Sequence, residues 1–529
     1  MVAGDSDPAA SGPLRLSETA GVLSLATDLA MGQPLEHSLR TAVVAVRVAE
    51  AMGLGLPEQA TVYYTGLLHF AGCTADSDID AGFFGDELAA RPQMMAAFLG
   101  SRRELVSTAM HIAHADSPPL ARAMAITRSA AGGIAEFREW ARTHCDVARI
   151  IGGRMGLPAG VQEALQHLYE RWDGKGMPGD VRGEEIPLAV RIMHVAQDAD
   201  MAWQHGGLAA AARVVSGRAG AGLDPGPAAA FTELGEKAFE GLDVASVWDA
   251  AMFAEPGPQV VIDNDRVDTC LSAAADFADL KSTWTIGHSR GVADLAERAG
   301  ITALMPPGEV TQLRRAALVH DVGRVAVPVR VWNKAGPLTR DERERVRLHA
   351  YYSERVLEAA GGLRSLARLA GSHGERSDGS GYHRGCRASE LPPAAWLLAA
   401  ADCYQAMRES RAYRPALSAA EAADQLSRAA EDGLLPADAV DAVLAASGQQ
   451  RPVRRPAGLS EREWEVLALL ARGLATKQVA RRLGISAKTC DHHIQSLYAK
   501  AGVSSRAGAT LFALEHGLIA SAGEPHAGS

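Results

Sequence analysis

Histidine and aspartate residues recur in the second half of the chain in an order that suits metal coordination. Two of them are adjacent, and an adjacent His-Asp pair can give one metal ion an imidazole while its carboxylate bridges to a second ion. A mixed set of imidazoles and carboxylates favours iron, manganese or zinc. The candidate ligands are His288, His320, Asp321, His349, His373 and Asp402.

Two metal ions held in this way can activate water and clamp a phosphodiester for displacement. A single histidine is more often an ordinary surface or core residue. Six ligand-type residues, placed in order along a helical repeat, instead favour a centre with up to two divalent ions.

The same anchor positions occur earlier in the chain, because the sequence contains an internal duplication. Two anchor pairs share an offset of 251 residues and two share an offset of 205, so the first copy carries an insertion of 46 residues. The pairs are His37 with His288, His69 with His320, His144 with His349, and Asp173 with Asp378.

Both carboxylate positions are lost in the first copy. Phe70 follows His69 where the second copy has Asp321, and Gln197 stands in the position of Asp402. Without a bridging carboxylate we expect no catalytic metal centre in the first copy. Its retained segment ERWDGKGMPGDVRGEEIPL is interpreted as a scaffold that can also offer a ligand or dimer surface.

The elements that must position these residues are helices. Alanine and leucine are abundant, β-branched runs are few and aromatic residues make up 5%, which predicts an all-α fold. The predicted organisation is a flexible segment (1–34), a degenerate helical copy (35–240), a linker (241–268), a helical copy with the metal site (269–447), a second linker (448–457) and a small C-terminal domain (458–521).

The second copy resembles the HD-GYP family of the HD superfamily over about 170 residues. The resemblance is carried by GHS, HDVGRVAVPVRVWNKAGPLTRDERERVRLHA, SHGERSDGSGYH and AAADCYQAM. It implies an all-helical fold, a binuclear or trinuclear metal centre held by the six ligands above, and hydrolysis of cyclic di-GMP.

Four positions depart from the family pattern. Trp284 replaces a glutamate that some members offer to a third metal, so we expect no third ion. Arg324 replaces a lysine and can still hold a phosphate oxygen, but it cannot shift its pKa into a proton-transfer role. Gly374 replaces a second histidine and His383 replaces a proline. Turnover of cyclic di-GMP therefore stays an open question.

The C-terminal segment has the pattern of a helix-turn-helix. Ser460 and Glu463 form a capping-box sequence, helices are predicted up to Gly473, over 476–483 and over 487–501, and Ser486 is the expected N-cap of the third. The third helix has an apolar face and a polar face, as a helix that enters the major groove of DNA requires. A docking bundle with a merely solvated basic face is the alternative interpretation.

Over its whole length of about 60 residues this segment resembles the LuxR-type helix-turn-helix domain. The anchors are LSERE, GLATKQVARRLGIS, KT-x-x-x-H and K-x-GVSSR. The resemblance implies that a homodimer binds double-stranded DNA. The residues expected at DNA, to phosphates or to base edges, are Lys477, Ser486, Lys488, Thr489, His492, Gln495 and Lys500.

Charge supports a nucleic-acid partner for this segment. Residues 451–519 contain eleven Arg/Lys and five Asp/Glu, whereas the whole chain has a net charge of −10. Six scattered cysteines, no long apolar run and no signal-peptide pattern predict a cytoplasmic protein that does not span a membrane.

The leading hypothesis is a transcription regulator in which HD-GYP-like domains that sense metal or nucleotide control a LuxR-type domain. The alternative is a metal-dependent phosphodiesterase or phosphohydrolase, acting on cyclic di-GMP or a similar nucleotide, with an accessory DNA-binding module. Two catalytically dead scaffolds that serve dimerisation and nucleotide sensing are a third interpretation. Metal content separates the enzyme hypotheses from the scaffold one.

Overall fold

The computed structural model describes residues 14–115, 119–243, 246–449, 456–503, 505–516 and 518. Within these ranges the secondary structure consists of α-helices and short 3-10 helices, without strands. The predicted all-α fold is therefore confirmed. The chain forms two compact units, residues 1–450 and residues 451–529.

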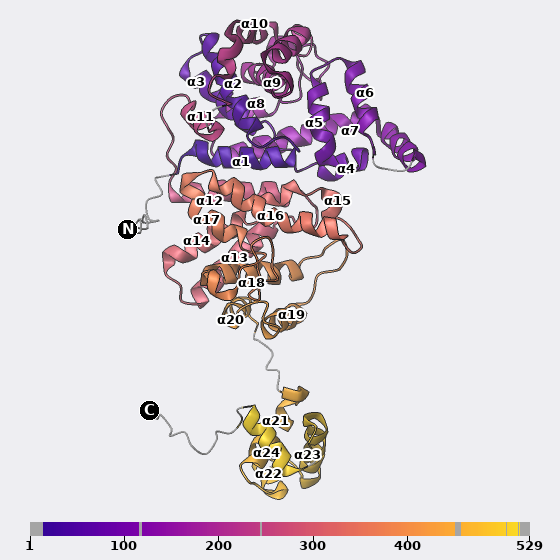
Figure 1. The fold of residues 1–529 in the computed structure, drawn as a ribbon, viewed down its shortest axis with the longest axis vertical. Coiled ribbons are helices and arrows are strands. Elements are labelled where there is room, and N and C mark those ends of the chain that lie inside the picture. Colours follow the sequence, from indigo (N-terminus) through magenta and orange to yellow (C-terminus); the bar gives the residue numbers. More distant parts are fainter. Residues whose placement is uncertain are drawn as a thin grey trace, which may run out of the picture. The chain divides into compact units, whose positions relative to one another are not determined.

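The first unit contains both copies of the duplicated domain, coloured indigo to magenta and pink to orange in Figure 1. The helices of the first copy are α1 (Leu16–Ala30), α2 (His37–Ala51), α3 (Leu56–Leu68), α4 (Ser77–Phe84), α5 (Glu87–Phe98), α6 (Arg102–Ile112), α7 (Pro119–Arg154), α8 (Ala159–Leu165), α9 (Leu188–Arg218), α10 (Pro225–Leu234) and α11 (Val247–Phe253). Those of the second copy are α12 (Asn264–Asp279), α13 (His288–Thr302), α14 (Pro307–Val319), η3 (Val322–Ala326), α15 (Val329–Trp332), α16 (Arg340–Glu358), α17 (Arg364–Gly371), α18 (Pro393–Arg408), α19 (Ala419–Glu431) and α20 (Ala437–Ala446).

Matching contacts show the duplication in three dimensions. The Asp28 carboxylate accepts hydrogen bonds from the backbone N–H and the hydroxyl of Ser38, and Asp279 accepts the same two bonds from Ser289. The residue before each first-turn histidine is left-handed, with φ of 74° at Glu36 and 80° at Gly287. Glycine adopts this left-handed conformation without strain, whereas a residue with a side chain, such as Glu36, adopts it only rarely.

The N-terminal segment differs from the prediction of a flexible region over residues 1–34. Residues 1–13 lie outside the described residues, but residues 16–30 form α1, in which nearly every side chain is buried. The helix packs on α2 and α3 of the first copy and on η3 of the second. A helix enclosed on all sides carries no amphipathic pattern, which is why the sequence did not reveal it.

The predicted linker over residues 241–268 also contains ordered structure. Residues 244–245 lie outside the described residues, α11 covers residues 247–253, and α12 begins at residue 264. The hydroxyl of Tyr63 donates a hydrogen bond of 2.9 Å to the carbonyl of Ala251, which fastens α11 to the first copy.

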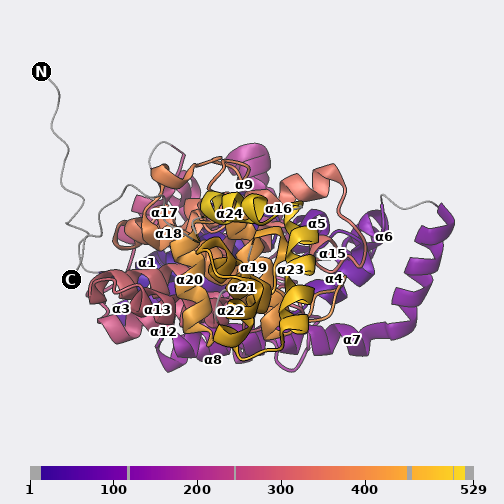
Figure 2. The same ribbon diagram turned by 90° about the horizontal axis from the view of Figure 1, so that it is seen from below.

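The insertion of the first copy forms α4, α5, α6 and the start of α7. The N-terminal end of α7, the longest helix, projects from the side of the first copy (Figure 2). Helix α4 instead packs against α15 of the second copy. The insertion therefore contacts the copy that carries the six candidate ligands.

The second unit contains α21 (Glu461–Ala471), α22 (Thr476–Leu483), α23 (Ala487–Ala501) and α24 (Arg506–Glu515) around a core of its own. The predicted capping box is present, since Ser460 Oγ accepts the N–H of Glu463 and the Glu463 carboxylate accepts the N–H of Ser460. The predicted linker 448–457 lies mostly outside the described residues. None of the described helices is long and apolar enough to cross a membrane.

Candidate functional site

Four buried imidazoles of the second copy point their Nε2 atoms toward one carboxylate. Their Nδ1 atoms are held by acceptors on the far side of each ring: the Ala317 carbonyl for His320, the Val346 carbonyl for His349, the Ala370 carbonyl for His373 and the Glu409 carboxylate for His288. An acceptor at Nδ1 fixes the tautomer and leaves Nε2 free to bind a metal.

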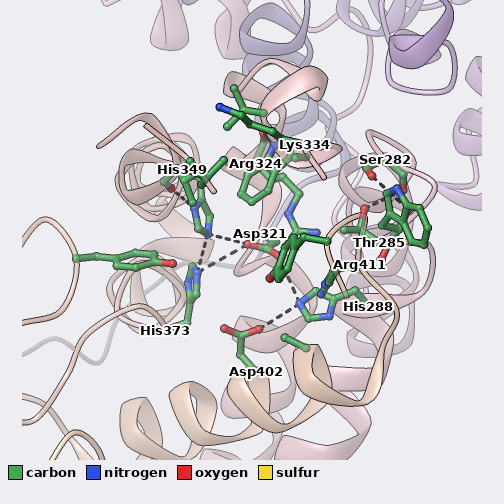
Figure 3. A pocket seen from close by; sticks show the side chains of 18 of the residues that line it. Ser282, Thr285, His288, Asp321, Arg324, Lys334, His349, His373, Asp402 and Arg411 are labelled. Carbon is green, nitrogen blue, oxygen red and sulfur yellow. Dashed lines mark hydrogen bonds and ion pairs between the residues drawn. The ribbon is translucent and has the colours of Figure 1, made fainter. Parts of the chain in front are cut away.

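Asp321 is the carboxylate at the centre of this group (Figure 3). Its Oδ2 lies 3.6 Å from Nε2 of His288 and 3.4 Å from Nε2 of His320. Its Oδ1 lies 3.0 Å from Nε2 of His349 and 3.7 Å from Nε2 of His373. Each oxygen therefore faces its own pair of imidazoles, which is the arrangement of a carboxylate that bridges two ions.

Asp402 joins the group from α18. Its Oδ1 lies 3.1 Å from Nε2 of His288 and 3.9 Å from Nε2 of His320. The structure thus brings all six predicted ligands together. The sequence analysis missed Glu409, whose Oε2 lies 2.9 Å from Nδ1 of His288. The sequence signal that could have identified Glu409 is its spacing: it follows Asp402 by seven residues, about two helical turns, and so lies on the same side of the chain as Asp402.

The anionic Asp321 and the neutral His373 have the charge states of metal ligands, whereas His288 would have to release a proton to bind an ion. Burial favours the neutral acid at Asp321, but Arg324 and His320 outweigh burial and hold the pKa of this carboxyl well below its usual range. Burial opposes the charged form of His288, yet hydrogen bonds to Asp402 and Glu409 raise the pKa of His288 to about 9. Burial, reinforced by His320 and His349, lowers the pKa of His373 to about 3.

Two divalent ions fit this donor set. Both oxygens of Asp321 and Nε2 of His320 are buried without a hydrogen-bond partner in the described structure. Unpartnered buried polar atoms are costly, and bound cations would satisfy them. Within the described residues, the groups of three converging donors are His288, His320 and Asp321, and Asp321, His349 and His373.

Two glycines allow the chain to approach the ligands closely. A Cβ on Gly323 would lie 2.2 Å from the carbonyl oxygen of His349, so η3 can pass against α16 only with glycine at this position. A Cβ on Gly374 would lie 2.0 Å from the ring of Tyr382. The half-buried Tyr382 ring thus occupies the space that a second histidine side chain at position 374 would need.

A cavity of about 400 Å³ opens onto the ligands. Its lining combines cationic side chains, aromatic side chains and five of the six candidate ligands, all except His320. The cationic residues are Arg324, Lys334 and Arg411, and the aromatic residues are Trp284, Trp332, Tyr382 and Tyr413. Such a lining suits a ligand that is both anionic and aromatic.

Arg324 lies within this cavity beside the bridging carboxylate. Its Nη2 forms an ion pair with Oδ2 of Asp321, and its guanidinium carbon lies 4.8 Å from the centre of the Trp332 ring. Nε and Nη1 of Arg324 are buried without partners in the described structure. These N–H groups are therefore available to an anionic ligand.

The corresponding region of the first copy is filled by side chains. The Phe70 ring lies 3.9 Å from the His69 ring, centre to centre, in the position that Asp321 takes in the second copy. Burial, reinforced by His37, lowers the pKa of His69 to about 3, and burial, reinforced by Arg91, lowers that of His144 to about 3. Gln197 is also buried there. The absence of a catalytic metal centre from this copy stays a prediction.

Helix α23 of the second unit presents the residues predicted to meet DNA. Lys488, Thr489, His492 and Gln495 are exposed, whereas Cys490 and Leu497 lie in the core. Lys477 is exposed at the start of α22.

Two of the predicted DNA contacts also have partners inside the unit. Ser486 Oγ accepts the backbone N–H of Thr489 at 3.0 Å and so caps α23. Nζ of Lys500 lies 2.7 Å from Oε2 of Glu463. Lys500 therefore ties α23 to α21, and its role at DNA stays a prediction.

Comparisons with known proteins agree with both parts of the chain. The family described as HD domain matches residues 124–216 and 272–435, one segment in each copy. The family described as bacterial regulatory proteins, luxR family, matches residues 457–513.

Individual relatives are phosphodiesterases. The chain is 26% identical over 405 residues to the 3'3'-cGAMP-specific phosphodiesterase 3 of Vibrio cholerae. This match covers 76% of this chain and 88% of that protein. It is 34% identical over 146 residues to a cyclic di-GMP phosphodiesterase of Thermotoga maritima, covering 27% of this chain and 38% of that protein.

A solved structure shares the fold of most of this chain. The crystal structure of a cyclic GMP-AMP-specific phosphodiesterase of V. cholerae (V-cGAP3) matches with a TM-score of 0.56 at 24% identity, covering 83% of this chain and 98% of that one. This likeness shows the fold, and the two family matches identify the chain as one with HD-GYP-like domains in both copies, the first degenerate, followed by a LuxR-type domain.

Proposed function

We propose that this protein is a DNA-binding regulator whose second HD domain binds two divalent metal ions and hydrolyses a phosphodiester bond of a cyclic dinucleotide. The observation that carries the proposal is Asp321, whose two oxygens each face a separate pair of imidazole Nε2 atoms. Burying a carboxylate among four imidazoles and one guanidinium is costly, and two bound cations would offset that cost.

The residues that would hold the ions form two groups around the shared Asp321. His288, His320 and Asp402 would complete one group, and His349 and His373 the other. When bound, such ions supply Lewis-acid stabilisation of the phosphoryl oxygens and make water a stronger nucleophile. Hydrolysis adds water across one P–O bond of the cyclic substrate and yields a linear dinucleotide.

Cationic side chains around the ligands would orient the phosphate. Arg324 keeps two N–H groups without partners beside Asp321, in reach of an oxygen that approaches the carboxylate. Because Nη2 of Arg324 is occupied by Asp321, Nε and Nη1 would each donate a single charge-assisted hydrogen bond rather than a parallel pair. Arg411 contributes further positive charge, although its Nη2 already pairs with Glu409 at 2.9 Å.

Exposed aromatic rings at the cavity support a nucleotide ligand. Trp284 is 39% exposed and Tyr413 is 61% exposed, although both line the cavity. Exposed rings beside a phosphate site provide faces on which purine bases can stack. The two substrates to be tested first are those of the relatives named above, 3'3'-cGAMP and cyclic di-GMP.

The C-terminal unit would bind duplex DNA through α23, which carries exposed Lys488, Thr489, His492 and Gln495 on one face. A LuxR-type domain implies that two copies of the chain meet on a two-fold DNA site. We infer that occupancy or turnover at the HD domain controls this binding.

The test uses the full chain loaded with Mn²⁺ and supplied with cyclic di-GMP or 3'3'-cGAMP. The expected result is a linear dinucleotide, detected by chromatography, with Asp402→Asn abolishing its formation. Asp294→Asn is the matched control, because Asp294 lies exposed on the same helix as His288. Wild-type protein that holds two ions and leaves both nucleotides intact would contradict the hydrolase assignment.

A second candidate is a sensor that binds the nucleotide without cleaving it. The ion pair between Arg324 and Asp321 favours it, because the guanidinium occupies space beside the bridging carboxylate. Saturable nucleotide binding without product, together with a change in DNA affinity on binding, would select the sensor over the hydrolase.

A further inference from the structure

The degenerate first copy contributes an acidic side chain to the walls of the cavity in the second copy. Glu87, the first residue of α5 within the insertion, lies among residues of the second copy. Two wall segments meet there: residues 281–285, which precede His288, and residues 329–334, which follow η3. Both segments supply side chains that line the cavity, including Trp284, Trp332 and Lys334.

Glu87 binds both wall segments with a single oxygen. Its Oε1 lies 2.7 Å from Nζ of Lys281 and accepts the backbone N–H of Val329 at 2.8 Å. The side chains of Glu87 and Lys281 are each 0% exposed. This contact joins residues 194 positions apart in the sequence and couples the two copies.

Neighbouring acids of the insertion hold the same wall. Oδ1 of Asp78 accepts a hydrogen bond from Nδ2 of Asn333, whose Oδ1 accepts the hydroxyl of Ser282 at 2.6 Å. Asp86 pairs with Arg330 at 3.0 Å. Asn333 therefore links the two wall segments to each other as well as to the first copy.

The wall in turn fixes a residue beside the bridging carboxylate. The indole N–H of Trp332 donates to the carbonyl of Arg324 at 3.2 Å, and the Trp332 ring stacks on the Arg324 guanidinium. Arg324 pairs with Asp321. A continuous set of contacts thus runs from Glu87 through Val329 and Trp332 to the ligand-binding end of Arg324.

A buried ion pair adds little net stability to a fold, because its desolvation cost is close to its Coulombic gain. Apolar residues at both positions would serve packing equally well. A positioning role explains the buried pair better, because the carboxylate oxygen of Glu87 fixes where the Lys281 ammonium group and the Val329 N–H lie.

We propose that Glu87 of the first copy is a positioning residue for the nucleotide cavity of the second copy. The substrate part of this inference rests on the proposed function. The degenerate copy then has a defined role: it holds the residues 281–285 and 329–334 in the geometry that binds a cyclic dinucleotide.

The experiment replaces the pair in the full chain by Glu87→Met with Lys281→Met, which removes both buried charges together. The variant should keep its two Mn²⁺ ions and melt only a few degrees lower, because apolar replacement of the pair is near neutral while the buried Val329 N–H loses its acceptor. The KM for the cyclic dinucleotide should rise roughly 10- to 100-fold while kcat is unchanged, because the walls and not the metal ligands lose their support. Amide hydrogen exchange of residues 329–334 should accelerate.

A rescue variant and a control separate positioning from general damage. Glu87→Gln with Lys281→Met keeps an oxygen that accepts the Val329 N–H, so it should restore slow exchange and most of the affinity. Arg154→Gln is the control. It removes another contact between the copies, the ion pair with Asp276, which does not line the cavity. It should change neither the hydrogen exchange of residues 329–334 nor the KM.

Unchanged exchange and unchanged KM in the double methionine variant would overturn the proposal, as would faster exchange without any change in KM. If the wild-type chain neither binds nor cleaves cyclic di-GMP or 3'3'-cGAMP, the proposed function fails. Exchange of residues 329–334 then still decides whether Glu87 positions the wall.

Discussion

Replacing Asp321 by asparagine should release both metal ions, because both candidate ion positions use this one carboxylate. The variant keeps the shape of the side chain and removes its charge. At the position near His349 and His373, Asp321 is the sole carboxylate ligand, so two imidazoles would remain. At the position near His288 and His320, Asp402 would still contribute an anionic oxygen.

The size of the effect follows from this ligand count. Loss of a partner that merely orients a ligand costs about 10–100-fold in metal affinity, so loss of the shared ligand itself should cost at least roughly 100-fold per ion, about 3 kcal/mol. The loss should be larger at the His349–His373 position. Asp402→Asn should instead weaken one ion, and His349→Ala should weaken the other.

Metal content per chain, measured by mass spectrometry after dialysis of Mn²⁺-loaded protein, distinguishes these outcomes. The expected values are two ions for the wild type, one for Asp402→Asn and for His349→Ala, and none for Asp321→Asn. Asp294→Asn, on the exposed face of α13, should keep both ions.

Folding must be controlled, because Asp321→Asn leaves the buried guanidinium of Arg324 without its anionic partner. An uncompensated buried charge costs about 3–5 kcal/mol. Asp321→Asn combined with Arg324→Met removes both members of the pair and should melt close to the wild type, still without ions. Retention of two ions by this folded variant would refute ligation by Asp321, and retention of one would refute the bridge.

Three further predictions concern other parts of the chain. Lys488→Ala should lower DNA affinity for all sequences and reduce the salt slope by about one unit, whereas Gln495→Ala should relax base preference by about 1–3 kcal/mol; salt titrations of binding to specific and random duplexes check both, and salt-independent binding by the wild type would contradict the assignment. At Glu463 burial favours the neutral acid, but Lys500, Ser496 and the Ser460 amide outweigh it and lower the pKa of Glu463 to about 2, so its stabilisation is present above the usual pKa of about 4.5 and is lost as the pH falls toward 2. Glu463→Gln should therefore destabilise residues 451–529 by about 1–2 kcal/mol at neutral pH, a figure reduced for solvent screening of Lys500, and thermal melts should show this difference shrinking below about pH 4.5 and disappearing only as the pH falls through about 2. Gly323→Ala should displace η3 from α16, cost about 2–3 kcal/mol and lower metal content; a variant with wild-type stability and two ions would show that the close approach at Gly323 is not needed.

The six candidate ligands and the helix-turn-helix could be predicted because their signals are local. A ligand must be histidine or aspartate whatever surrounds it, and spacing within a helix, capping residues and turn glycines depend on neighbours in the chain. The boundaries of α22 and α23 follow the sequence for the same reason.

Pairings between distant residues could not be predicted. The position of Asp200 in the first copy corresponds to Gln405, and that of Gln204 to Glu409, so acid and amide are exchanged between the copies. In the folded chain Asp200 binds Nδ1 of His37 just as Glu409 binds Nδ1 of His288, each at 2.9 Å. Either position can supply the carboxylate, because the two side chains lie one helical turn apart and point at the same ring.

The sequence by itself determined the helical class, the duplication, the order of the six ligands, the loss of both carboxylates from the first copy and the helix-turn-helix pattern of the C-terminal unit. The tertiary structure alone decided that α1 is enclosed between the copies, that Asp321 faces two pairs of imidazoles, and that Glu87 of the degenerate copy meets Lys281 beside the cavity. The physical reason is that ligand type and helix periodicity are written in neighbouring residues, whereas a buried contact depends on where two helices cross, and that is set by packing over the whole unit.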